Sequence, residues 1–168
     1  RALMDAGVHN VAVGAMVDAQ AVQFACEAGV GAELTMRIGG KACALSGDPL
    51  DLAVEVKAIK TDAKQTTSGG PIPMGTTAAL RAGDIDIVLT TRKRQTFGPD
   101  LFTDLGVDLA TKKAIVVKSA QHYRIKFEGL FAEDIVVDAP GVCPSDVDKL
   151  PFKRITRPMW PFDENPFG

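Results

Sequence analysis

The sequence contains few cysteines and histidines, and each shortage argues against a class of protein. Its 168 residues include three cysteines, two histidines and a single tryptophan. An odd number of widely spaced cysteines is not the pattern of a disulfide-stabilised secreted module. It favours a reducing compartment, which we expect to be the cytoplasm. Cys26, Cys43 and Cys143 are each predicted to be small buried side chains.

Long hydrophobic runs and an excess of one charge are also missing. The longest apolar runs fall far short of a transmembrane span. The 19 basic and 21 acidic residues give a net charge of −2, which argues against a nucleic-acid or membrane surface as the partner. The length suits one domain of ordinary size with a real core. Because the chain opens at Arg1, inside a predicted helix, we interpret it as a fragment of a longer protein.

The chain also lacks the motifs of a self-contained hydrolytic site. A catalytic zinc needs about three protein ligands, and His9 and His122 lie far apart with no HExxH pattern. We therefore predict that this segment binds no metal. A G-x-S-x-G motif is absent, which argues against a serine hydrolase. Ser119 and His122, three residues apart, are typical of a helix start rather than of a catalytic dyad.

The apolar pattern predicts a single α/β domain with a mixed β-sheet and packed helices. A helix ends at Gly7, and a strand follows over residues 11–17. Asp18 then caps a helix that ends at Gly29, with Val22, Ala25 and Cys26 on its inner face. Residues 32–38 are a predicted strand, which makes the opening βαβ-like.

Alternating polar and apolar residues over 51–60 predict a half-exposed, antiparallel strand. Residues 61–75 are polar and rich in glycine and proline, and we expect a loop. Residues 76–82 and 84–91 predict a hairpin about Gly83, with Ile85, Ile87 and Leu89 facing the core. The basic run 92–94 is expected to be a solvated edge, although one of its residues could reach an anionic ligand. Residues 99–105 predict a short helix.

Prolines dominate the end of the chain and exclude long helices after Gly141. Trp160 and Phe162 would allow this extended tail, residues 142–168, to pack over the domain. Before it, residues 135–137 predict a further buried strand.

Residues 114–131 contain the best functional candidates. The run 114–117 is short and β-branched, as in a strand buried on both faces. A helical stripe of Tyr123, Phe127, Leu130 and Phe131 follows it. The intervening turn exposes backbone N–H groups, at the strand end where α/β sheets bind ligands.

Other strand ends supply further candidates. Gly39, Gly40 and Lys41 follow a strand, where turned N–H groups and an ammonium would suit an anion such as a peptide carboxylate. A simple turn is the alternative. Asp18 also lies at a strand end, where it is either a site residue or simply the cap of the helix that follows. Asp138 ends the predicted strand 135–137.

Several short motifs carry a family resemblance. They are SAQHYR at 119–124, IGGK at 38–41, VDAPG at 137–141, LPFKR at 150–154 and RPMWP at 157–161. Together they resemble the C-terminal domain of the microcystinase C (MlrC) family, over nearly the whole of residues 1–168. Asp18-Ala19 departs from the Asp-Pro often found in that family. This leaves the cap intact but weakens an argument from the proline.

The resemblance implies a part of a zinc metallopeptidase or related hydrolase. The zinc would be held by an N-terminal domain, which would be this segment's partner. The segment would complete a cleft for a peptide-like substrate and would be inactive by itself. The alternative is a non-catalytic scaffold or dimerisation domain, with a homo-oligomer as the partner state.

The residue types at the strand ends, together with the resemblance, predict roles for individual residues. His122 would donate to a substrate carbonyl or oxyanion. Arg124 would bind a carboxylate, and the wider substrate-binding set is Gly39, Gly40, Lys41, Gln121, Arg124 and Asp138. The alternatives are a hydrogen-bonded His122 at a helix start and an Arg124 paired with Glu128. Convergence of the turns at 39–41, 119–124 and 138–141 on one pocket would favour a substrate cleft. Separate positions of these turns would favour a scaffold.

Overall fold

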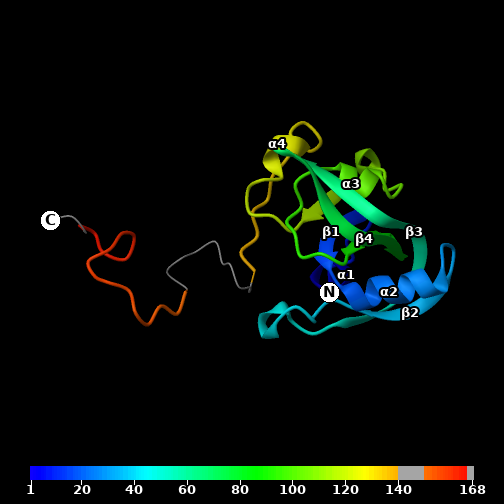
Figure 1. The fold of residues 1–168 in the computed structure, drawn as a ribbon, viewed down its shortest axis with the longest axis horizontal. Coiled ribbons are helices and arrows are strands. Elements are labelled where there is room, and N and C mark those ends of the chain that lie inside the picture. The colour runs from blue at the N-terminus through cyan, green and yellow to red at the C-terminus, as the bar shows by residue number, and fades with distance from the viewer. Residues whose placement is uncertain (140–149, 166–168) are drawn as a thin grey trace. The chain divides into compact units, whose positions relative to one another are not determined.

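A computed structural model describes residues 1–139 and 150–165, in two compact units, residues 1–133 and 134–168. The first unit is built on a six-stranded sheet with the order β2-β3-β4-β5-β1-β6. β5 and β6 are parallel to β1, and the remaining pairs are antiparallel. The predicted α/β fold with a mixed sheet is confirmed (Figure 1). The elements are α1 (Ala2–Asp5), β1 (Val11–Val17), α2 (Ala19–Ala28), β2 (Glu33–Ile38), η1 (Ala44–Ser46), β3 (Leu50–Thr67), β4 (Gly70–Ala82), β5 (Ile85–Thr90), α3 (Asp100–Thr103), η2 (Leu109–Thr111), β6 (Ala114–Val117) and α4 (Arg124–Phe127).

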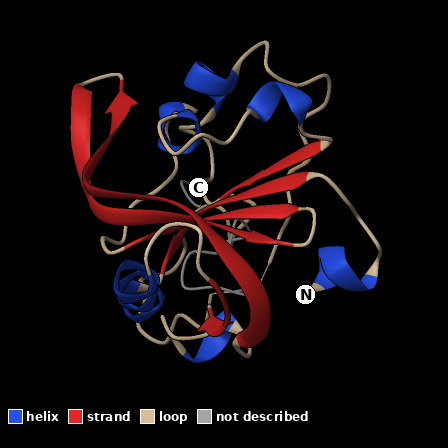
Figure 2. Ribbon diagram, turned by 90° about the vertical axis from the view of Figure 1, so that its right-hand side faces the viewer, coloured by secondary structure: helices blue, strands red, loops and turns tan. Residues whose placement is uncertain are grey.

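Two apolar cores lie on the two faces of the sheet, and helices stand on both sides of the strands in Figure 2. Alternate residues of a strand point to opposite faces. In β5, Ile87 therefore joins the core beneath α2, and Val88 joins the core beneath α3 and α4. All six residues of β5 are buried, as expected for a central strand covered on both sides. Gly14 allows close packing in the second core, because a Cβ there would lie 3.0 Å from the Phe102 ring.

The locally encoded elements are confirmed. The Asp18 carboxylate accepts a hydrogen bond from the Ala21 N–H, and α2 ends at Gly29. β4 and β5 form the hairpin about Gly83, with Ile85, Ile87 and Leu89 in the core. α3 follows Pro99. The basic residues 92–94 are exposed.

The predicted loop over residues 61–75 is wrong. β3 continues to Thr67 and β4 begins at Gly70, so these residues form a long hairpin. The polar appearance of the segment misled the prediction, because Gln65 is an inward-facing side chain that is fully buried. The predicted βαβ opening is also wrong. β2 pairs with β3, and three strands separate it from β1.

Three further predictions are corrected. β6 pairs with β1 at a sheet edge, so it is not buried on both faces, and its Val116 is 41% exposed. α4 is a single turn: Tyr123 and Phe127 are buried, but Leu130 and Phe131 lie beyond it and are exposed. In α2, Cys26 is exposed and Ala21 takes the inner position. These errors have one physical cause: the burial of a side chain depends on which elements pack against it, and the local sequence pattern does not give that.

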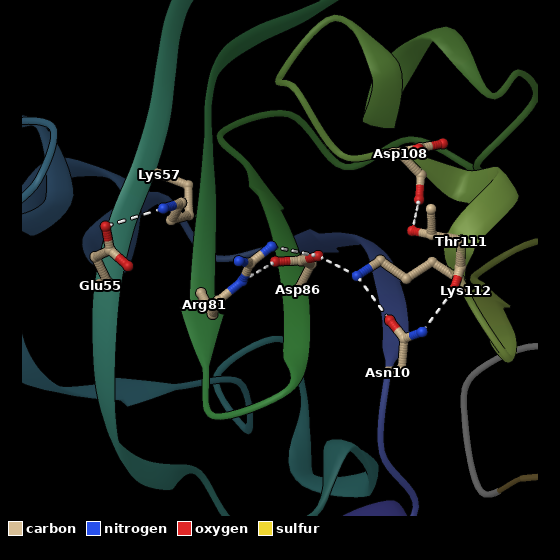
Figure 3. Close-up of polar contacts among 8 residues, drawn as sticks. All are labelled: Asn10, Glu55, Lys57, Arg81, Asp86, Asp108, Thr111 and Lys112. Carbon is tan, nitrogen blue, oxygen red and sulfur yellow. Dashed lines mark hydrogen bonds and ion pairs between the residues drawn. The ribbon is translucent and has the colours of Figure 1, made fainter.

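An ionic cluster around the buried Asp86 joins the carboxyl end of β4, the amino-terminal end of β5 and the segments just before β1 and β6 (Figure 3). Asp86 of β5 is 2% exposed and receives a two-point contact from Arg81 of β4, at 2.8 and 3.1 Å. Lys112 contacts the same carboxylate at 2.5 Å and donates to Asn10. Burial raises the pKa of Asp86. The hydrogen bonds from Arg81 and Lys112 outweigh it, so the pKa of this carboxyl lies below its ordinary value.

The second unit has no helix or strand among its described residues, so the predicted strand 135–137 is wrong. A β-branched run forms a strand only where another strand pairs with it. Within this unit, Arg157 binds Asp163 at 2.6 Å, and the Phe152 and Phe162 rings meet edge to face. Packing of the tail on the domain stays a prediction. Cys143, Pro140 and Gly141 lie outside the described residues. Among the described helices, none is both long and apolar enough to cross a membrane.

Candidate functional site

The predicted site residues of the first unit form two separate groups. One group surrounds Asp18, at the end of β1. The Asp18 carboxylate accepts hydrogen bonds from the N–H of Ala21, the N–H of Gly39 and the Lys41 ammonium, the last at 2.8 Å. Lys41 also donates to the Arg37 carbonyl. The Asp18 side chain is 1% exposed, so this carboxylate ties the ends of two strands to α2.

The contacts around Asp18 give the Gly39-Gly40-Lys41 turn a structural role. The ammonium that would attract an anion already neutralises a buried carboxylate, and the Gly39 N–H already has an acceptor. Gly40 has a φ of +67°, and a Cβ there would overlap the backbone of Pro49. Substrate binding by this turn stays a prediction, and the geometry supports it less than it supports the second group.

The second group surrounds His122, between β6 and α4. The His122 Nδ1 lies 3.1 Å from the Gln95 Oε1, and the Ser119 hydroxyl donates to the same oxygen at 3.1 Å. The Phe97 ring packs beside the imidazole, with 5.3 Å between ring centroids. His122 is therefore held by a segment that lies about 25 residues earlier in the chain.

The segment 95–97 is itself fixed by buried side chains. Gln65 of β3 donates to the Gln95 carbonyl at 2.7 Å and accepts from the Phe97 N–H at 2.9 Å. The Thr96 hydroxyl donates to the Gly14 carbonyl and accepts from the Ala15 N–H. This point of β1 is an irregularity in its pairing with β5. The threonine therefore accepts from the Ala15 N–H at this irregularity, and it is a second donor to the Gly14 carbonyl, which also accepts from the Lys118 N–H.

A pocket of about 210 Å³ opens beside His122. Its walls are the tip of the β3–β4 hairpin, residues 67–69, together with Phe97 and the exposed side of α4 at Ile125 and Lys126. The long hairpin, wrongly predicted as a loop, therefore builds one wall of the pocket.

The remaining predicted residues occupy different places. Gln121 accepts from the Arg124 N–H through its carbonyl, and the Arg124 guanidinium lies 6.0 Å from the Tyr123 ring centre. Asp138 belongs to the second unit. In Figure 1, α4 lies at the top of the view and the turn after β2 at the bottom. The two groups within the first unit therefore do not converge on one pocket.

Sequence reasoning found His122 but missed Gln95, Thr96 and Phe97. The segment follows a basic run that looks solvated, and its contacts are all distant in sequence. The one available signal was Phe97-Gly98-Pro99, an aromatic residue in a polar stretch just before a helix.

Comparison with known proteins places the chain in a family. The family model described as MlrC C-terminus matches residues 1–154. The chain belongs to the MlrC C-terminus family. Microcystinase C from Sphingomonas sp. is 32% identical to this MlrC C-terminus chain over 163 residues, which are 97% of the chain and 31% of that protein.

A solved structure shares the fold. The crystal structure of a "putative metallopeptidase" from Mesorhizobium sp. BNC1 superposes with a TM-score of 0.80 at 28% identity. The alignment covers 96% of the MlrC C-terminus chain and 33% of that protein. The chain thus spans about a third of the length of the relatives it matches.

The described residues of this MlrC C-terminus chain do not fit a metal centre. No three histidine, cysteine, aspartate or glutamate side chains among them gather to hold an ion. Around His122 the neighbours are Gln95, Ser119 and Phe97, which are an amide, a hydroxyl and an aromatic ring. These are not the nitrogen, sulfur and carboxylate ligands that zinc prefers.

Proposed function

We propose that this chain is the C-terminal domain of a metallopeptidase or related amide hydrolase, and that its His122 pocket is part of the substrate cleft. The observation that carries the proposal is the immobilised histidine at the mouth of a pocket. Among the predicted site residues described, His122 lines this pocket and is held by side chains from a distant segment. The names of the two relatives supply the reaction class.

The pocket suits a peptide-like substrate. Phe97 and Ile125 offer apolar contact, and Ser68 at the hairpin tip offers a hydroxyl. Lys126 supplies a positive charge at the same rim, which would favour a substrate carboxylate. In this proposal the zinc implied for the family is bound elsewhere in a longer chain. His122 acts as a hydrogen-bonding and proton-transfer group on the substrate.

The experiment compares two histidine variants in the full-length protein. A panel of short peptides is assayed for hydrolysis, and zinc content is measured in parallel. His122→Ala should lower kcat by about a hundredfold or more, because a positioned proton-transfer group contributes roughly 10² to 10⁴ in rate. His9→Ala is the matched control, since His9 is an exposed histidine beside Asp84.

The outcomes separate this proposal from a scaffold role. A scaffold or dimerisation domain would lose nothing when His122 is removed, provided that it remains folded. Wild-type kcat in His122→Ala would therefore refute the catalytic role. A wild-type protein that hydrolyses no peptide or amide would refute the reaction class.

A further inference from the structure

One nitrogen of the His122 ring faces the side-chain oxygen of Gln95. A carbonyl oxygen accepts hydrogen bonds and cannot donate them, so a ring nitrogen bonded to it must be protonated. The Gln95 Oε1 lies 3.1 Å from Nδ1 of His122 and also receives the Ser119 hydroxyl. The oxygen has two lone pairs, and these two donors use both.

The remaining ring nitrogen, Nε2, has no partner among the described residues. In a neutral ring with the proton on Nδ1, Nε2 carries a lone pair and cannot donate. We propose that Gln95 is a positioning residue that holds neutral His122 in the Nδ1–H form and so makes Nε2 a proton acceptor in the pocket. The assignment of the ring form is independent of the proposed function, and only the catalytic role of Nε2 rests on it.

The backbone around Gln95 explains how a glutamine on the surface can impose this choice. The buried Gln65 fixes the Gln95 carbonyl and the Phe97 N–H, and the buried Thr96 is bonded to β1. The amide therefore starts from a rigid backbone. Phe97 restricts the imidazole from a second side, with its plane inclined at 51°.

The inference changes the expected role of the histidine. As a neutral ring, His122 cannot stabilise an oxyanion through Nε2, which is the role the resemblance implied. It can take a proton at Nε2 from a water or a substrate group. The imidazolium then keeps Nδ1–H on Gln95 and can return the Nε2 proton to a leaving group.

The test is nuclear magnetic resonance of the 168-residue chain labelled with ¹⁵N-histidine, at about pH 9, where an unperturbed imidazole is neutral. Nitrogen shifts distinguish the two neutral forms. The chain has two histidines, so His9 is an internal control. We expect His122 to be mainly in the Nδ1–H form. Gln95→Leu should lower the ratio of Nδ1–H to Nε2–H by roughly fivefold, the effect of one net hydrogen bond.

Gln95→Glu is the conservative variant, because its carboxylate still accepts from Nδ1. It should retain the Nδ1–H form, and the His9 signals should not change in either variant. An Nε2–H ring in the wild type, as a reversed Gln95 amide would produce, overturns the inference. Equal effects of the leucine and glutamate variants would overturn it too.

The readout is independent of activity. If His122→Ala retains wild-type kcat while the Nδ1–H form is observed, the positioning by Gln95 stands and the proposed function fails. If His122→Ala loses activity while the wild-type ring is Nε2–H, the proposed function stands and the positioning fails.

Discussion

Two polar clusters in the first unit differ in what they leave unbonded. The Asp86 cluster is buried, and its carboxylate is contacted by both Arg81 and Lys112. The His122 cluster lies at the surface, and one ring nitrogen has no partner among the described residues. Both include contacts between residues far apart in sequence, Lys112 with Asp86 and Gln95 with His122. The two clusters therefore differ in whether every polar group has a partner within the protein, and not in how far apart in sequence their residues lie.

The comparison shows how stability and function divide between the two clusters. In a low-dielectric interior a charge without a partner is costly, so the partners of Asp86 must remain in place. At the surface, water supplies the missing hydrogen bond at little cost, so an unpartnered imidazole nitrogen remains available to a ligand. Removing groups from the buried cluster should damage the fold, and removing groups from the exposed cluster should not.

The largest expected effect is that of Asp86→Ala. It leaves Lys112, whose side chain is 8% exposed, without its carboxylate. Removing one partner of a buried pair typically costs about 3–5 kcal/mol. Urea unfolding followed by circular dichroism measures the change in the free energy of unfolding.

The control for Asp86→Ala is Asp51→Ala, which breaks the exposed pair with Arg37. The loss should be much smaller, because solvent screens the attraction between exposed charges. Equal losses in the two variants would show that burial does not distinguish the Asp86 cluster.

The next effect is that of Thr96→Val, which removes a hydroxyl at constant shape. The Ala15 N–H would lose the hydroxyl that accepts its hydrogen bond, whereas the Gly14 carbonyl would keep the Lys118 N–H as a donor. One unsatisfied buried group costs about 1–3 kcal/mol, which is the loss we expect in the free energy of unfolding. Thr96→Ser keeps the hydroxyl and should retain most of the stability. A valine variant as stable as the serine variant would contradict this role.

These residues also show what the sequence could and could not predict. The cap at Asp18, the stop at Gly29 and the turn at Gly83 were predicted, because each depends on neighbouring residues. The length of β3 and the edge position of β6 were not. A buried Gln65 looks like a loop residue, and a β-branched run has the same pattern at a sheet edge as at its centre.

The candidate site divides in the same way. His122 was predicted because it follows a strand and precedes a helix. Gln95 was not, because its bond to His122 joins segments 27 residues apart with no periodic pattern between them. Lys41 was predicted as a ligand-binding cation, but its ammonium is bonded to Asp18. A side chain's partner cannot be read from its type.

Acid should weaken the Asp86 cluster. The folded-state pKa of Asp86 lies below its ordinary value, so its contribution to stability is present above about pH 4. That contribution is lost as the pH falls through the folded-state pKa. The free energy of unfolding should therefore decrease on acidification below about pH 4. The decrease should be shallower in Asp86→Asn, which cannot titrate at this position. Parallel curves for the two proteins would contradict the assignment.

The smallest expected effects are those of His122→Ala and Gln95→Leu on stability. Both side chains are exposed, and their hydrogen bond can be replaced by water. The backbone bonds of Gln95 to Gln65 do not involve the side chain that is changed. Surface substitutions of this kind usually stay within about 0.5 kcal/mol, so the urea midpoint should hardly move. A loss comparable to that of Thr96→Val would mean that the His122 cluster also supports the fold. Reduced activity in His122→Ala could then no longer be attributed to chemistry alone.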